Sequence, residues 1–356
     1  MGKWEKRSLV GAPLFAAANS GRGFVNFYDD VFDNSRIQTR YLIKGGPGTG
    51  KSHLLRRVAQ YAEQQGRSVM CYRCSSDPDS LDGIVIDESI ALIDSTAPHS
   101  VEPTLVGARD RIVNLGDFWD ADALSEHREE IATLAEKKSA CYRRGYRFLA
   151  ACDEVYEVNR SLVLPYVKHE KLAAAVSRRL SRVPRGNGFR LIPGLSDAVG
   201  MKGSVHLDSY EQRAERLYVI EDFCDTGTLF LRALLTGGAQ KEMPMRVSYH
   251  PIHLGEPDAV LFCDTGECFV IARDEQTCQK AAARINMKRF LDVEGLRGVR
   301  TRLRMNGRLY DALLGSAEEA LQKAGEYHFE LERIYSAHMD FAAQNRFIES
   351  FCLKIL

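Results

Sequence analysis

The stretch Gly45-Gly46-Pro47-Gly48-Thr49-Gly50-Lys51-Ser52 decides the fold, because it joins a short apolar run to a helical pattern. It follows Tyr41-Leu42-Ile43 and fits the phosphate-loop form of Gly, four residues and Gly-Lys-Ser. Its glycines let the backbone turn tightly with the amides pointing inward, where a Cβ would obstruct a phosphate. We therefore predict a strand, a phosphate-binding loop and a helix in direct succession.

The loop predicts the binding of a nucleoside triphosphate, with ATP and Mg²⁺ as the expected cofactors. The Lys51 ammonium is expected to reach the β- and γ-phosphates, and the Ser52 hydroxyl to hold Mg²⁺. The dipole at the helix N-terminus also favours an anion. The expected cofactor-binding residues are Gly45, Gly46, Pro47, Gly48, Thr49, Gly50, Lys51 and Ser52.

The composition is that of an ordinary globular protein, and its 356 residues are enough for two domains. The 48 basic and 48 acidic residues balance, so there is no global field for nucleic acid or acidic membranes, and neither is expected as a partner. No apolar run approaches the roughly 20 residues of a membrane span, and residues 1–7 lack the apolar core of a signal peptide. Nine scattered cysteines suit reduced thiols. We expect a cytoplasmic protein.

Short strands around one helix indicate an α/β fold with a parallel sheet. The helix after the loop is expected to end at Gly66, where the helical spacing of apolar residues stops. Further strands are expected at residues 68–72 and 90–93, and residues 77–80 are typical of a turn.

Residues 120–180 are rich in charge and poor in glycine, and apolar or small residues recur there at steps of three, four or seven. This spacing predicts a long helical hairpin, with Pro165 at a bend or at the turn between its arms. The basic pairs Lys137-Lys138 and Arg143-Arg144 are interpreted as a solvated helix face, because glutamates precede them in the sequence.

The second half of the chain repeats the first. Tyr41-Leu42-Ile43 matches Tyr218-Val219-Ile220 at an offset of 177 residues, and Tyr72 matches Tyr249 at the same offset. We predict a tandem duplication, in which each unit carries a helical hairpin. The predicted domains are a nucleotide-binding domain over residues 1–181, with its hairpin over about 120–180, and a degenerate repeat over residues 182–356.

The loop of the second half, residues 222–229, has lost its phosphate chemistry. Thr228 replaces the lysine and Leu229 replaces the serine, while Asp222 and Asp225 add negative charge. A carboxylate a few ångströms from a triphosphate repels it by about 1 kcal/mol or more. We expect no nucleotide in this half. It is interpreted as a structural unit kept for packing, with regulation or partner binding as the alternative.

Asp94 follows an apolar strand, where many phosphate-loop proteins place the carboxylate that holds Mg²⁺ through water. We take Lys51 and Asp94 as the catalytic residues. Ser95 stands where many ATPases carry a glutamate that activates water, so the catalytic base stays open. The candidates for that base are Asp77, Asp79, Asp82 and His99.

Further stretches accompany the loop: Phe15-Ala16-Ala17-Ala18-Asn19, Arg22-Gly23-Phe24-Val25, residues 74–83, Asp94 with Thr96-Ala97-Pro98-His99, and Asn114-Leu115-Gly116 with Trp119. With them, nearly the whole chain resembles a family of bacterial proteins with two phosphate-loop halves. Its members are described only as ATP-binding proteins or ATPases, without an established biological role. The loop also resembles those of AAA-type ATPases, without their arginine-finger pattern. The resemblance implies ATP binding on a P-loop NTPase fold, although family members with an intact second loop differ from this chain.

We therefore expect an ATPase with one active site in the N-terminal half. Two alternatives stay open. One is a switch that binds nucleotide, turns over slowly and presents a surface to a protein partner through its second half or its hairpins. The other is a kinase for a small molecule or a nucleotide, in which the hairpin would serve as a lid.

Overall fold

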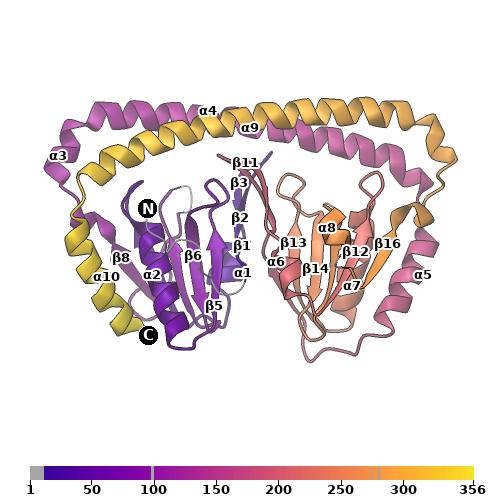
Figure 1. Ribbon diagram of the computed structural model, residues 1–356, viewed down its shortest axis with the longest axis horizontal. Coiled ribbons are helices and arrows are strands. Elements are labelled where there is room, and N and C mark those ends of the chain that lie inside the picture. Colours follow the sequence, from indigo (N-terminus) through magenta and orange to yellow (C-terminus); the bar gives the residue numbers. More distant parts are fainter. Residues whose placement is uncertain (1–11, 98–99, 274, 280) are drawn as a thin grey trace.

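The computed structural model describes residues 12–97, 100–273, 275–279 and 281–356. Within these ranges, two six-stranded sheets lie side by side beneath two long helices, α4 (Arg128–Val163) and α9 (Arg300–Ala337) (Figure 1). The chain has an α/β fold, as predicted. None of the helices in the described ranges combines the length and the apolar character that a membrane crossing requires.

The first sheet has the strand order β1-β5-β6-β7-β4-β8. The prediction of a wholly parallel sheet is wrong, because β6 runs antiparallel to both of its neighbours. β6 follows β5 after a short turn, and two strands joined so closely pair in the antiparallel sense. The strands are β1 (Leu14–Phe15), β5 (Val69–Arg73), β6 (Leu81–Ile86), β7 (Ile90–Asp94), β4 (Thr39–Lys44) and β8 (Asp110–Asn114).

The second sheet has the order β9-β13-β14-β15-β12-β16, in which β14 is the antiparallel strand. The strands of the second sheet therefore have the same order and the same relative directions as the corresponding strands of the first sheet. Its strands are β9 (Arg190–Pro193), β13 (Pro244–Tyr249), β14 (Pro257–Phe262), β15 (Glu267–Ile271), β12 (Arg216–Glu221) and β16 (Ala283–Asn286).

Helices cover the outer faces of both sheets, and a shared core lies between their inner faces. Apolar residues of α2 (Lys51–Gln64) and α10 (Phe341–Ile355) pack on the first sheet. The inner core joins residues of both sheets with the short helix α1 (Tyr28–Phe32) and with Tyr210 of α6. Shorter elements of the described residues include the helices α3 (Ala121–Glu126), α6 (Ser209–Arg213) and α8 (Glu275–Gln279) and the hairpin strands β2 (Ala17–Ser20), β3 (Gly23–Asn26), β10 (Asp197–Gly200) and β11 (Gly203–His206).

The predicted helical hairpin is not formed within the first half. α4 is one helix of 36 residues, about 54 Å long, and it lies antiparallel to α9 from the second half (Figure 1). His127 contacts His338 at one end of the pair, and Asn306 donates a hydrogen bond to Asn159 near the other. The apolar stripe of so long a helix needs a partner of similar length, which only α9 among the described helices provides. Pro165 does lie at a bend, in a short 3₁₀ turn.

Beyond this bend, α5 (His169–Leu180) packs against α7 (Gly227–Gln240) and so covers the second sheet. In return α10, the last helix of the chain, covers the first sheet beside α2. The two halves thus exchange their terminal helices, and the packing crosses the predicted boundary between residues 181 and 182.

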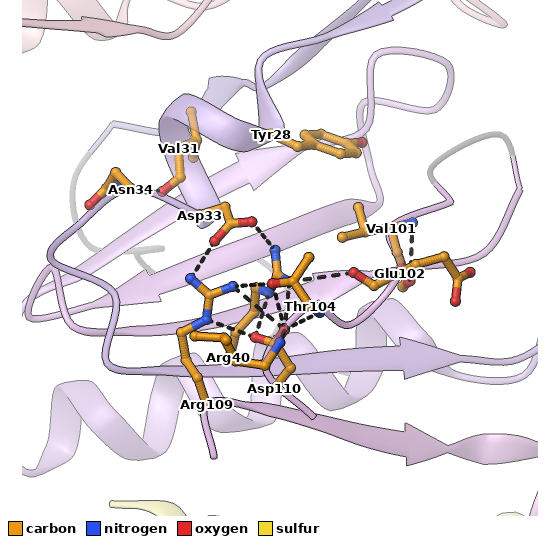
Figure 2. Close-up of polar contacts among 12 residues, drawn as sticks. Tyr28, Val31, Asp33, Asn34, Arg40, Val101, Glu102, Thr104, Arg109 and Asp110 are labelled. Atoms are coloured by element: carbon orange, nitrogen blue, oxygen red, sulfur yellow. Dashed lines mark hydrogen bonds and ion pairs between the residues drawn. The ribbon is translucent and has the colours of Figure 1, made fainter. Parts of the chain in front are cut away.

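The strand that leads into the loop of residues 45–52 is anchored at its start by a buried network of ion pairs (Figure 2). The Arg40 side chain is 2% exposed and pairs with Asp110 at 2.8 Å and Asp33 at 2.7 Å. Burial raises the pKa of Asp110, but hydrogen bonds from Arg40 and Arg109 outweigh it and hold this pKa well below its usual range. The network ties β4 to β8 and to the turn after α1.

Candidate functional site

The strand, the loop and the helix follow one another as predicted, and α2 begins at Lys51. Gly48 and Gly50 have φ angles of 67° and 78°, in the left-handed region that glycine adopts without strain. The Thr49 hydroxyl donates a hydrogen bond to the Gly46 carbonyl at 2.8 Å and closes the loop on itself. These angles explain why glycine stands at two of the loop positions.

The structure brings Lys51, Ser52 and Asp94 together at the carboxyl ends of β4 and β7. The Lys51 ammonium lies 3.7 Å from the Asp94 carboxylate and donates to the carbonyl oxygens of Gly45 at 3.0 Å and Gly46 at 2.7 Å. The Ser52 hydroxyl oxygen accepts the backbone amide of Leu81 at 3.0 Å. A cation, a hydroxyl and a carboxylate therefore converge at the N-terminus of one helix.

A cavity of about 710 Å³ opens in front of the loop, within the range of about 300–1,000 Å³ common for small-molecule sites. Its floor is formed by the loop and the strand ends, and its roof by α4 and α9. The charged and aromatic side chains that line it are Phe24, Lys51, His53, Asp77, Asp82, Asp94, Lys138, Tyr142, Arg143, Tyr146, His328 and Glu332.

Two of the candidate bases follow β5, and a lysine from the second half engages both. The Lys202 ammonium donates to the Asp79 carboxylate and lies 3.7 Å from Asp77. Asp77 lines the cavity, whereas Asp79 is exposed outside it. Lys202 comes from the turn between β10 and β11, so the second half reaches the rim of the site.

The third candidate, Asp82, lies on the cavity floor and is buried. Its carboxylate accepts the Tyr28 hydroxyl at 3.3 Å. Burial and, after it, the negative charge of Asp82 raise the pKa of Tyr28 well above its usual value, so this hydroxyl keeps its proton. The fourth candidate, His99, lies outside the described residues.

Residues at the end of the chain complete the site, and sequence reasoning did not find them. A Cβ on Gly48 would lie 2.6 Å from the backbone oxygen of Glu332 in α9, and one on Gly50 would lie 2.9 Å from the Gln344 side chain in α10. The Gln344 amide donates to the Thr49 carbonyl at 2.7 Å. The glycines at 48 and 50 thus make room for two helices.

Glu332 brings a negative charge to the same side of the loop. A hydrogen bond from His328 lowers its pKa, burial opposes this, and the Gly48 amide and the Lys51 charge lower the pKa further. The carboxylate therefore stays ionised beside the loop.

The interpretation of the basic pairs on α4 as a solvated face is wrong for Lys138. Lys138 is half-buried, and both Lys138 and Arg143 line the cavity. The reason is the pairing with α9, which turns this side of α4 toward the loop. Lys137, Arg143 and Arg144 are exposed, as expected, and Arg143 lies at the rim of the cavity.

Comparison with models of protein families, with curated proteins and with solved structures finds no match to this chain. A function for the chain is therefore inferred from the arrangement of the site alone.

In the second loop, a carboxylate of the loop itself accepts backbone amides. Asp222 accepts the backbone amide of Gly227 at 2.6 Å and that of Asp225 at 3.0 Å. Strand register also places Ile271 beside Ile220, the position that Asp94 holds beside Ile43 in the first sheet. The lysine, the serine and the strand-end aspartate are thus all replaced in this unit.

Proposed function

We propose that the chain is an ATP-binding P-loop protein and a Mg²⁺-dependent ATPase with one active site in its N-terminal half. The observation that carries the proposal is the meeting of Lys51, Ser52 and Asp94 on one cavity at the start of α2. Backbone amides and an ammonium at a helix N-terminus suit the phosphates of a nucleotide.

The side chains present fit a magnesium ion. A serine hydroxyl and a carboxylate are hard oxygen ligands, and Mg²⁺ is commonly held by one or two such groups together with phosphate oxygens and water. Ser52 and Asp94 would hold it, and the ion would neutralise charge on the transferred phosphoryl group. Lys51 would bind the phosphates directly.

We infer that the two units arose by tandem duplication and that the second has become a structural or partner-binding unit. The shared strand order and directions support this origin. The Asp222 carboxylate supports the loss of nucleotide binding, because it accepts the loop amides that a phosphate would need and would repel that phosphate.

Replacing Lys51 by alanine is expected to weaken MgATP binding at least about a hundredfold, because buried charge-assisted contacts to phosphate are lost. Isothermal titration calorimetry on the whole chain measures this. Lys44→Ala is the matched control, since Lys44 ends β4 just before the loop but pairs with the exposed Glu102. If Lys51→Ala binds MgATP as the wild type does, the proposed function is wrong.

A nucleotide-dependent switch is the second candidate, and one observation favours it. The carboxylates that could activate water or hold Mg²⁺ already have partners. These are Asp77, Asp79, Asp82 and Asp94, and each has a hydrogen bond or an ion pair in the structure. A base engaged in this way activates water poorly, so turnover would be slow. Phosphate release that Asp94→Asn abolishes, while MgATP still binds, would support the ATPase. Binding without measurable release would support the switch.

A further inference from the structure

Lys138 lies on the face of α4 that roofs the cavity, about ten residues into the long helix. Ala135, Ser139 and Tyr142 of the same helix line the cavity with it, at the spacing of one helix face. The ammonium of Lys138 therefore shares a half-buried space with that of Lys51.

Lys51 and Lys138 differ in the partners that the described residues give them. Lys51 has two carbonyl oxygens and the Asp94 carboxylate nearby. In the part of the chain that the structure describes, no hydrogen bond or ion pair reaches Lys138. The Glu332 carboxylate acts on Lys138 through its charge, but it is engaged by His328 at 3.5 Å.

An ammonium held in this way is unfavourable for the free protein. Burial lowers the pKa of Lys138, and the positive charge of Lys51 lowers it further, against a smaller opposing effect of Glu332. Two cations in one partly desolvated cavity repel each other, and a ligand with several negative charges would relieve the repulsion. The arrangement thus favours a polyphosphate.

We propose that Lys138 is a second phosphate-binding cation, which α4 places opposite the loop so that the polyphosphate of a nucleotide is held between the two. The proposal rests on the proposed function, because it places the same ligand in the same cavity. It makes the site a composite of the loop and the bridging helix. Nucleotide binding would thereby involve a helix that also contacts the second unit through Asp153 and His253, 2.7 Å apart.

The test is a calorimetric titration of MgATP into wild-type protein, Lys138→Met, Lys138→Arg and Lys137→Met. Lys138→Met removes the charge and keeps the length of the side chain, and it is expected to weaken binding about tenfold or more. Lys138→Arg is expected to stay within about threefold of the wild type. Lys137 is exposed and stacks on Tyr327, so Lys137→Met should bind normally.

Two further readouts separate a phosphate contact from a structural role. The loss in Lys138→Met should shrink as the salt concentration rises, because salt screens the charge that has been removed. The ligand-free Lys138→Met variant should unfold at the same denaturant concentration as the wild type or at a higher one, since a partly buried charge is gone. A lower midpoint would assign Lys138 a structural role and overturn the proposal.

The remaining outcomes are also decisive. If wild-type protein does not bind MgATP, both this proposal and the proposed function fail. If wild-type protein binds and Lys51→Ala does not, but Lys138→Met binds as the wild type does, only the role of Lys138 is wrong. Equal losses in Lys137→Met and Lys138→Met would also overturn it, because they would indicate a general effect of charge.

Discussion

Replacing Arg40 by alanine is expected to lower the free energy of unfolding by about 3–5 kcal/mol, as when one partner of a buried ion pair is removed. The Arg40 side chain is 2% exposed, and the substitution would leave Asp110, whose side chain is fully buried, without its main partner at the start of β4 (Figure 2). Denaturant titration measures the change. Because β4 leads into the loop of residues 45–52, the denaturant concentration at which half of the nucleotide binding is lost should fall together with the midpoint of unfolding.

The control is Arg36→Ala, which removes an exposed ion pair with Glu88 and should change the free energy of unfolding by less than about 1 kcal/mol. Acid provides a second check. The pKa of Asp110 is lower in the folded protein than in the unfolded chain, where it is about 3.9. The ionised carboxylate therefore stabilises the fold at pH values above the unfolded pKa, and this contribution is lost as the pH falls through the folded pKa. The difference in the free energy of unfolding between wild type and Arg40→Ala should therefore be largest at neutral pH and shrink below about pH 4. A difference under about 1 kcal/mol at neutral pH would contradict the network.

Replacing Gly48 by alanine is expected to cost more than about 2 kcal/mol of stability and to weaken MgATP binding about tenfold or more. A Cβ there would lie 2.6 Å from the backbone oxygen of Glu332, so either the loop or α9 has to move. The φ angle of 67° adds about 1–2 kcal/mol for any residue with a Cβ. Stability and affinity can be measured on the same variant by denaturant titration and calorimetry.

Gly66→Ala separates these two effects. Gly66 has a similar φ angle of 74°, but nothing lies within 4 Å of the position that a Cβ would take. This substitution should cost only about 1–2 kcal/mol and leave nucleotide affinity unchanged. Equal costs for the two variants would show that α9 does not press on the loop.

The local features of the first unit were predictable because short-range spacing determines them. β4, the loop and α2 follow from an apolar run, a glycine-rich turn and a helical repeat. β6 was missed because Asp82 and Gly83 interrupt its apolar run. Gly83 is there for a tertiary reason, since a Cβ would lie 2.6 Å from the Phe32 ring. That contact leaves no local signal, and without β6 the sheet was predicted to be wholly parallel.

The partners of the long helices were not predictable from spacing. A stripe of apolar residues shows that α4 must be buried against something, but it fits α5 and α9 equally well. The same limit applies to the site. Lys51 and Ser52 belong to one local motif and Asp94 ends an apolar run, so each leaves a local signal. Lys138 and Gln344 reach the site only through the pairing of α4 with α9 and through the packing of α10.

The exchange of terminal helices also has a consequence for biosynthesis. Gln344, which holds the loop through Thr49, lies 295 positions after it in the chain. A ribosome therefore releases the loop, α2 and the first sheet long before α10 is available to cover them. Contacts at such a sequence separation slow folding, and until they form the outer face of the first sheet stays partly uncovered. The nascent N-terminal unit is therefore the stage at which apolar surface is most open to aggregation.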